Sequence, residues 1–159
     1  MTRSAQDDAL AESLLSRGLR SFVEMRYKRE TLESLRSHPY FEKIRQGRIQ
    51  HDNIKELAKA LTSLSIGRQP SLWHELNGCE RPLLVIVGKK DNKFKKIAKQ
   101  MFNCKVDQPK HEEKRTDHMQ SITVLEVDHS GHAMHIENPL PVINAIRKFV
   151  MTTLIAAQA

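Results

Sequence analysis

Three histidines stand at every third position in the stretch DHSGHAMHIENP, residues 128–139. They are His129, His132 and His135, and a carboxylate that could act with them, Asp91, follows an earlier apolar run in GKKD. A carboxylate beside an imidazole holds the ring in one tautomer and stabilises its protonated form, which is what proton transfer requires. The competing chemistry is zinc binding, but the histidine spacing is shorter than that of zinc fingers and no thiolate or carboxylate completes a known pattern nearby. We therefore expect proton-transfer chemistry from Asp91 and His132, and no metal.

Plainer roles remain open for each of these residues. In the plainer interpretation, Asp91 is a helix cap with no catalytic role and His132 is a structural histidine. His135 fits the start of helical packing, and His129 fits a solvent-facing neighbour of the loop. What favours the functional interpretation is that Asp91 and His132 follow two successive expected strands, with Gly88 and Gly131 allowing tight turns.

Two short strands are expected to position the pair. Residues 83–87, LLVIV, form a continuous apolar run ended by glycine, which is typical of a strand covered on both faces. Residues 121–127, SITVLEV, indicate a second strand, and residues 91–102 between them have helical periodicity. Strand, helix, strand predicts a parallel crossover unit. The tips of neighbouring parallel strands lie about 4.8 Å apart, so the following loops can bring Asp91 and His132 into hydrogen-bond reach.

The rest of the regular structure is expected to be helical. Helices are predicted over 7–26, 30–36 and 40–47, and over 52–65 with Asp52 as its cap. A last helix should begin at Pro139 after an Asn138 cap. The apolar stripes expected to be buried are Leu10, Leu14, Leu15, Leu19, Phe22 and Val23 in the first helix, Ile54, Leu57, Leu61 and Leu64 in the fourth, Phe94, Ile97, Ala98 and Met101 between the strands, and Val142, Ile143, Ile146, Phe149 and Val150 in the last.

Composition narrows the class of protein. The chain has 159 residues, 28% of them charged and 39% hydrophobic, with no run of roughly 18 apolar residues that a membrane helix needs. Cys79 and Cys104 suit two reduced thiols better than a disulfide framework. The net charge is +7, and many of the basic residues lie in 88–100 and 105–118, where acids interrupt them, so a solvated face is favoured over nucleic-acid binding. An anionic small substrate is a further possibility, and residues 105–120 should form a flexible insert.

A family resemblance adds to this picture. RPLLVIVGKKDNKFKKIAKQM and DHSGHAMHIENPLPVINAIRKFV resemble the last two strand segments of the α/β-hydrolase fold, and GHAMHIENP resembles its catalytic-histidine loop. GRIQHDNIKELAKALTSLSIGRQPSLWHEL is similar to the cap region of 2-succinyl-6-hydroxy-2,4-cyclohexadiene-1-carboxylate synthases of menaquinone and phylloquinone biosynthesis, and to part of a multifunctional plant protein. The resemblance implies a protein of the α/β class with a partial α/β-hydrolase fold. A helical cap would occupy 1–75 and a βαβα core 76–159, with the amino-terminal half of the sheet missing.

The resemblance also implies an activity and its residues. Asp91 would be the triad acid and His132 the triad base of a lyase in which a serine abstracts a substrate proton and pyruvate is expelled, without a cofactor. Arg48 would meet a substrate carboxylate, which a guanidinium binds bidentately. Arg68 is a weaker candidate for the same task. Tyr27 would line the substrate site, although Arg26 stands before it where relatives tend to have tryptophan.

The chain lacks the nucleophile that this activity needs. A hydrolase serine sits in G-x-S-x-G, with glycines four positions apart. The six glycines here stand at 18, 47, 67, 78, 88 and 131. We therefore expect no activity from the chain alone, and a partner that supplies the amino-terminal half of the hydrolase domain.

Two other functions remain open at this stage. One is a fragment of another hydrolase of the same fold, such as an esterase, and the other is a non-catalytic interaction module. The resemblance implies a plastid location, although the amino terminus MTRSAQDDALAESLL carries no targeting signal, and composition alone fits a soluble cytoplasmic protein.

Overall fold

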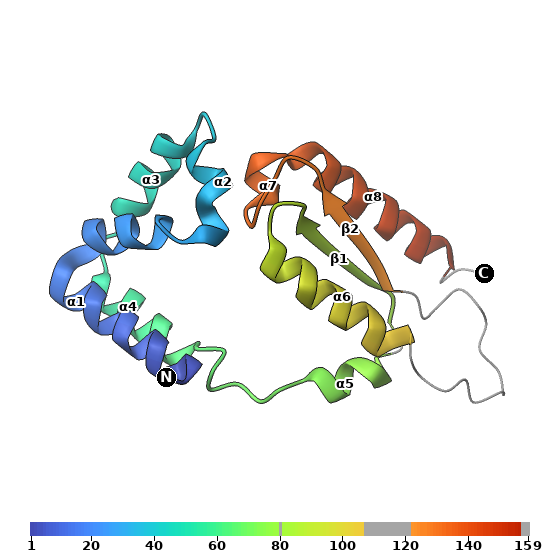
Figure 1. The fold of residues 1–159 in the computed structure, drawn as a ribbon, viewed down its shortest axis with the longest axis horizontal. Coiled ribbons are helices and arrows are strands. Elements are labelled where there is room, and N and C mark those ends of the chain that lie inside the picture. The colour runs from blue at the N-terminus through green and yellow to red at the C-terminus, as the bar shows by residue number, and fades with distance from the viewer. Residues whose placement is uncertain (80, 107–121, 157–159) are drawn as a thin grey trace. The chain divides into compact units, whose positions relative to one another are not determined.

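The computed structural model describes residues 1–79, 81–106 and 122–156. These residues form two compact units, Met1–Ser71 and Leu72–Ala159. Figure 1 labels the α-helices and strands of both units in chain order. Within these ranges, no helix combines the length and the apolar character needed to cross a membrane.

The regular structure of the first unit is entirely helical, as predicted. Its elements are α1 (Arg3–Tyr27), the short 3-10 helix η1 (Glu30–Leu32), α2 (Glu33–Arg36), α3 (Phe41–Ile49) and α4 (Ile54–Ser63). Thr2 caps α1, because its hydroxyl accepts a hydrogen bond from the amide of Ala5 at 3.3 Å. Gly18 has a φ of 77° inside α1, and the helix kinks there. This φ is strained for any residue with a Cβ, so the kink requires glycine even though the space around it is open.

The core of the first unit lies between α1 and α4. Leu14 is its most deeply buried residue, with 0% of its surface exposed. Two leucines predicted for the same stripes are exposed instead: Leu15 by 56% and Leu64 by 70%. Leu15 lies about 100° around the helix from Leu14, and Leu64 is the cap residue that follows the last helical residue of α4, Ser63. The buried cluster consists of Ala11, Leu14, Leu19, Phe22, Val23 and Ala58.

The cap of α4 is one residue later than predicted. Asn53, not Asp52, accepts a hydrogen bond from the amide of Glu56, at 3.1 Å. Because α4 begins at Ile54, only Asn53 stands directly before the first helical residue, where a side chain can reach the unpaired amides.

The second unit contains the predicted parallel strand pair. Its elements are α5 (Trp73–Gly78), β1 (Leu83–Gly88), α6 (Asn92–Val106), β2 (Ile122–Val127), α7 (Met134–Glu137) and α8 (Pro139–Ala156). β1 and β2 are parallel, in register from Leu83 opposite Ile122 to Gly88 opposite Val127. Both α6 and α8 contact both strands, and Figure 1 shows them on opposite sides of the pair. This layering places the carboxyl ends of both strands at one edge of the unit. Asp91 and His132 lie in the loops that follow those ends.

Some expectations for the second unit were incomplete. The short helices α5 and α7 were not predicted, because six and four residues are too few to display a helical period. The segment 105–120 lies outside the described residues except for 105 and 106, which belong to α6 rather than to a flexible insert.

The burial predicted for α8 is wrong at three of five positions. The helix does begin at Pro139, but the side-chain amide of Asn138 donates to the carbonyl of Asp128, at 3.3 Å, a contact outside the helix. Val142 is buried and Phe149 half-buried, as expected. The exposed fractions of Ile143, Ile146 and Val150 are 49%, 47% and 46%. The apolar residues of α8 span a wider arc than two strands can cover.

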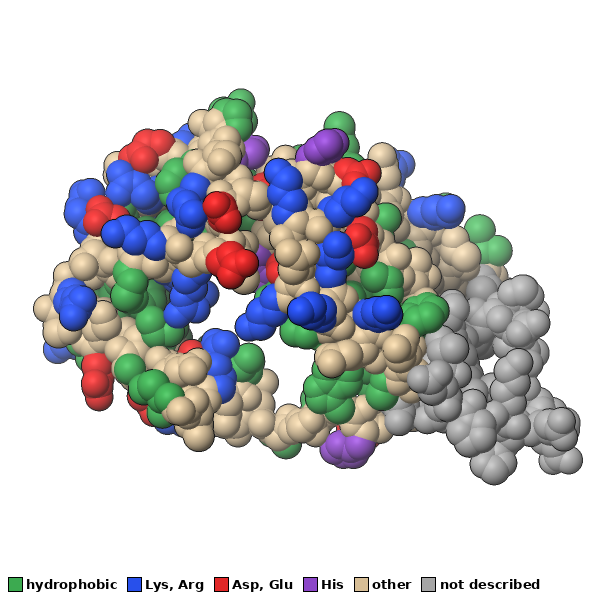
Figure 2. All heavy atoms as spheres, viewed as in Figure 1, with side chains coloured by type: hydrophobic (Ala, Val, Ile, Leu, Met, Phe, Trp, Pro, Cys, Tyr) green, Lys and Arg blue, Asp and Glu red, His purple; other side chains and the backbone are tan. Residues whose placement is uncertain are grey.

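The positive charge is concentrated on α6 in this unit. Lys93, Lys96 and Lys99 are exposed on that helix, and Figure 2 shows basic side chains, in blue, along it. The arrangement is that of a solvated basic helix face.

Candidate functional site

Asp91 is held in place by the turn between β1 and α6. Its amide donates to the carbonyl of Gly88 at 2.9 Å, which closes the turn directly after β1. Its carboxylate oxygen Oδ1 accepts a hydrogen bond from the amide of Phe94 at 3.1 Å, so Asp91 caps α6. Only 4% of the residue is exposed. The cap interpretation is thus correct, but it uses one carboxylate oxygen and leaves Oδ2 for another partner.

That partner is His132, which follows β2. Its Nδ1 lies 2.7 Å from Oδ2 of Asp91, while 42% of the histidine side chain is exposed, against 2% for the carboxylate. The ring also packs against Phe94, with 4.5 Å between the ring centroids. A buried carboxylate therefore anchors an imidazole that remains accessible on its other side. We infer that neutral His132 carries its proton on Nδ1, which leaves Nε2 able to accept one.

Backbone hydrogen bonds join the loops that carry the two residues. The amide of Lys89 donates to the carbonyl of Val127, and that of Lys90 to the carbonyl of Ser130, both at 2.9 Å. Gly88 explains how closely the loops approach. A Cβ on Gly88 would collide with the carbonyl oxygen of Gly131 and would lie 2.6 Å from that of Ser130. Only a glycine at this position allows the contact.

An ion pair spans the same two loops at the surface. Lys89 Nζ lies 2.8 Å from Asp128 Oδ1. The hydrogen bond and the opposite charge raise the pKa of the Lys89 ammonium and lower the pKa of the Asp128 carboxyl. Both side chains are more than half exposed, so the contribution of this pair to stability is small.

Two contacts of the histidine loop were missed by sequence reasoning. The amide of Gly131, next to His132, donates to Oε2 of Glu137 at 3.0 Å. The second carboxylate oxygen of Glu137 is buried without a hydrogen-bond partner among the described residues. The other missed contact is Phe94, which was expected only as a residue of the helix core. Helical periodicity does not predict the contact of Glu137, because this contact joins the amide of a loop residue to the last residue of α7.

The other two histidines of the loop do not join His132 in a metal site. His129 is exposed and has a φ of 59°, unusual for a residue with a Cβ, and His135 is exposed in α7. Across the described ranges, no three His, Cys, Asp or Glu side chains lie together as ligands of one ion would.

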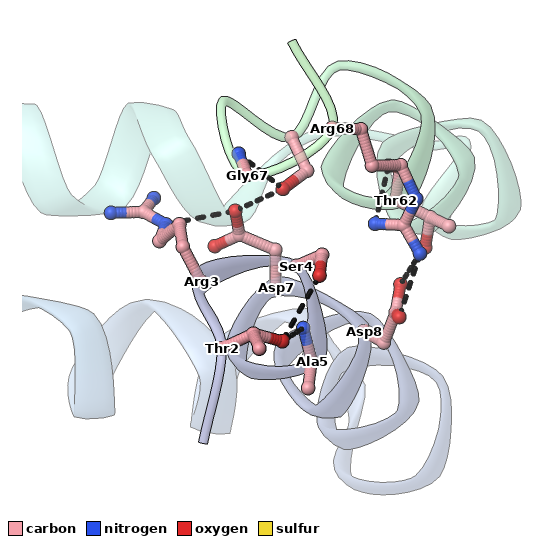
Figure 3. Close-up of polar contacts among 10 residues, drawn as sticks. Thr2, Arg3, Ser4, Ala5, Asp7, Asp8, Thr62, Gly67 and Arg68 are labelled. Carbon is pink, nitrogen blue, oxygen red and sulfur yellow. Dashed lines mark hydrogen bonds and ion pairs between the residues drawn. The ribbon is translucent and has the colours of Figure 1, made fainter. Parts of the chain in front are cut away.

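The residues expected to bind substrate belong to the first unit. Arg48 is exposed in α3, and in the described part of the chain its side chain makes no hydrogen bond or ion pair. Arg68 instead holds Asp8 through hydrogen bonds of 2.9 and 2.7 Å (Figure 3). Tyr27 is half-buried and meets Phe41 edge-on, with 5.1 Å between the ring centroids. Of the two candidate arginines, Arg48 is therefore the one whose charge no described residue neutralises.

A cavity of about 360 Å³ in the first unit was not predicted. Arg3, Arg26 and Asp7 line it together with apolar side chains of α1 and α4. Asp7 accepts a hydrogen bond from Arg3 at 2.9 Å (Figure 3) and another from Ser65 at 2.7 Å, and these lower the pKa of its carboxyl. Desolvation, together with the nearby Arg29 and Arg3, lowers the pKa of the Arg26 guanidinium. The cavity has the size of a small-molecule site.

The fold and the pair of Asp91 and His132 define a class of protein. Parallel strands followed by an acid and then by a histidine, with helices on both sides, make this chain a partial α/β-hydrolase fold. Among solved structures it is similar to MenH from S. aureus, with a TM-score of 0.76 and 26% identity. The match covers 99% of this chain and 53% of that one.

Two curated proteins are similar in sequence. Protein PHYLLO, chloroplastic, of Arabidopsis thaliana is 40% identical over 148 residues, which is 93% of this chain and 8% of PHYLLO. A 2-succinyl-6-hydroxy-2,4-cyclohexadiene-1-carboxylate synthase of Bacillus subtilis is 30% identical over 144 residues, 86% of this chain and 45% of the synthase. No protein-family model matches the chain. The chain is a homologue of PHYLLO and of MenH, and it spans about half or less of the length of each of these relatives.

Proposed function

We propose that this chain is part of a carbon–oxygen lyase in menaquinone or phylloquinone biosynthesis. The lyase eliminates pyruvate from a succinyl-enolpyruvyl-hydroxycyclohexene carboxylate, and this chain supplies the acid and the base of its catalytic triad. The observation that carries the proposal is the 2.7 Å contact between Asp91 Oδ2 and His132 Nδ1. Homology with the Bacillus subtilis synthase and with PHYLLO supports the choice of reaction.

Each member of the triad has one task in this proposal. Asp91 keeps the proton of the neutral imidazole on Nδ1, so that Nε2 of His132 takes the proton of a serine hydroxyl. The serine oxygen takes a proton from a ring carbon of the substrate. The electron pair left on that carbon forms the new ring double bond, and the carbon–oxygen bond to the enolpyruvyl group breaks. The enolate that leaves becomes pyruvate by taking, on its methylene carbon, the proton that His132 holds. Since no two glycines of this sequence are four positions apart, the serine elbow must come from residues outside it.

The substrate of this reaction is an anion, and the first unit offers charges to bind it. Arg48 is the stronger candidate for holding a carboxylate, because Asp8 already neutralises Arg68. The cavity provides the guanidinium of Arg26 beside apolar walls, which suits a carboxylated ring, whereas Arg3 is already paired with Asp7 there. Tyr27 contributes an aromatic contact in this proposal. No cofactor is needed.

The partner in this proposal is the amino-terminal half of a hydrolase domain, which brings the serine and the oxyanion donors. No nucleic acid is involved. A chloroplast location is part of the proposal, because PHYLLO is named as chloroplastic.

A chimera tests the function. The matched segment of the Bacillus subtilis synthase is replaced by this chain, and pyruvate release is followed with a coupled lactate dehydrogenase assay. We expect turnover, and a loss of about a thousandfold or more in kcat for His132→Ala, because removing the base of a triad removes most of the rate. For Arg48→Ala we expect a higher KM. The His129→Ala chimera, altered at an exposed neighbour, is the matched control and should retain its rate.

The result also separates the competing functions. A chimera that melts cooperatively but releases no pyruvate contradicts the lyase. If it hydrolyses p-nitrophenyl esters in a His132-dependent manner instead, the esterase-like function is favoured. The missing serine elbow favours the third candidate, an interaction module, and there His132→Ala should leave every measured property of the chain unchanged.

A further inference from the structure

Gly131, the residue before His132, is held from two sides. Its amide donates a hydrogen bond to Oε2 of Glu137, the last residue of α7, at 3.0 Å. On the other side its backbone lies so close to Gly88 that a Cβ there would collide with the carbonyl oxygen of Gly131. Gly131 is buried, whereas the side chain of His132 is 42% exposed. The backbone position from which the exposed imidazole extends is therefore fixed between α7 and the end of β1.

The carboxylate of Glu137 costs the fold stability. Its other oxygen, Oε1, is buried without a hydrogen-bond partner among the described residues. No Lys, Arg or His in the described ranges forms an ion pair with Glu137. A buried carboxylate oxygen that lacks a donor is unfavourable, and an unsatisfied group of this kind requires an explanation. Proteins keep destabilising groups where function needs them, and Glu137 binds the backbone directly beside the candidate base.

The neighbouring residue, Asn138, also binds the histidine loop, but at a different point. Its side-chain amide donates to the carbonyl of Asp128 at 3.3 Å. Asp128 stands at the start of the loop, four residues before His132. Among the described side chains, only Glu137 hydrogen-bonds the backbone of a residue adjacent to His132. The two contacts therefore separate two roles, because both hold the loop and only one of them holds it beside the imidazole.

We propose that Glu137 is a positioning residue for His132. By holding the amide of Gly131, it keeps the imidazole at the place where Nδ1 lies 2.7 Å from Oδ2 of Asp91. Without this acceptor, the buried amide has to find a water molecule or another carbonyl, and the loop shifts to allow it. A shift of about 1 Å in a catalytic group can cost about a hundredfold in rate. The inference rests on the function proposed above, in which His132 is the base.

Substitutions at two neighbouring positions separate the hydrogen bond from the charge and from the stability of the loop. Glu137→Gln removes the charge and keeps an oxygen that can accept from the Gly131 amide. Glu137→Leu removes both the charge and the acceptor while keeping a side chain of similar size. Glu137→Ala does the same with less bulk, and it replaces leucine in the test if leucine disturbs folding. Asn138→Ala is the matched control, because it loosens the loop at Asp128 only.

The first test uses the complete 159-residue chain and the ¹⁵N–¹H spectrum of its histidine rings. A proton that Nδ1 of His132 donates to Asp91 is protected from exchange with water and should give a separate signal. The signal should persist in Glu137→Gln and Asn138→Ala and should disappear in Glu137→Leu. An unchanged signal in Glu137→Leu, or its equal loss in Asn138→Ala, would overturn the inference.

The second test measures pyruvate release by the chimera described above. Glu137→Leu should lower kcat about ten- to a hundredfold and leave KM within about twofold, because the groups proposed to bind the substrate belong to the first unit. Glu137→Gln should stay within about threefold of the unaltered kcat, as should Asn138→Ala. A kcat that Glu137→Leu leaves unchanged, or a Glu137→Gln variant as slow as Glu137→Leu, contradicts the positioning role. A chimera that releases no pyruvate counts against the proposed lyase, and the ring signal then decides the role of Glu137.

Discussion

At the scale of single residues, Asp91 divides its carboxylate between two partners. Oδ1 accepts the amide of Phe94 at the start of α6, and Oδ2 meets Nδ1 of His132. The first contact stabilises a helix and the second orients an imidazole. Because the two contacts use different oxygens, different substitutions can separate them.

We expect Asp91→Asn to change the tautomer of His132 while keeping the cap. The asparagine amide can donate to Nδ1, which then accepts, so the neutral ring should move its proton to Nε2. Long-range ¹⁵N–¹H correlation spectra of the ring nitrogens measure this, with the exposed His129 as an internal control. Asp91→Ala should also lose the cap and about 1 kcal/mol of the free energy of unfolding, measured in urea. An unchanged His132 tautomer in Asp91→Asn would contradict the orienting role.

At the scale of elements, the site depends on how closely two loops approach. The loop after β1 passes the loop after β2 at Gly88, where a Cβ would collide with the backbone of Gly131. Neither of these backbone segments can move without disturbing Asp91 or His132, which stand within three residues of them. The glycine is therefore a requirement of the site and of the fold at once.

We expect Gly88→Ala to lower the free energy of unfolding by about 1–3 kcal/mol, as overpacking does. Gly47→Ala is the matched control. Gly47 lies in α3, and a Cβ at this position would meet no atom within 4 Å, so alanine there should raise the free energy of unfolding by about 0.5–1 kcal/mol. Urea denaturation followed by circular dichroism measures both. Equal effects of the two substitutions would mean that the two loops have room for a methyl group between them.

At the scale of the whole molecule, the two units hold different parts of the proposed chemistry. The acid–histidine pair belongs to Leu72–Ala159, and the cavity lined by Arg3 and Arg26 belongs to Met1–Ser71. The first unit encloses its own core between α1 and α4, so we expect it to fold without the strand pair.

Residues 1–71 expressed alone should therefore fold into a cooperative helical unit, seen as a single thermal transition by circular dichroism. A core of this size supplies only about 3–5 kcal/mol. Leu14→Ala, which removes a fully buried side chain, costs about 2–5 kcal/mol and should unfold the isolated unit. Leu15→Ala, at the exposed neighbouring position, should leave the transition almost unchanged. A gradual transition of the unaltered unit would show that it needs the rest of the chain.

The sequence by itself determined the elements and the placement of the candidate pair. The helical period of α1, α4, α6 and α8 and the apolar runs of β1 and β2 are local signals, and local backbone preferences produce those elements. Asp91 and His132 lie in the loops after those strands, so the parallel crossover was enough to predict their proximity.

Only the tertiary structure decided which apolar residues are buried and which charges are paired. Leu15, Leu64 and Ile146 belong to apolar stripes, but burial depends on how many neighbouring elements are present to cover each side of a helix. Arg68 meets Asp8 across sixty positions of sequence, and Glu137 reaches the amide of Gly131 through the packing of a loop. Such contacts follow from the three-dimensional path of the chain, and no periodicity in the sequence encodes them.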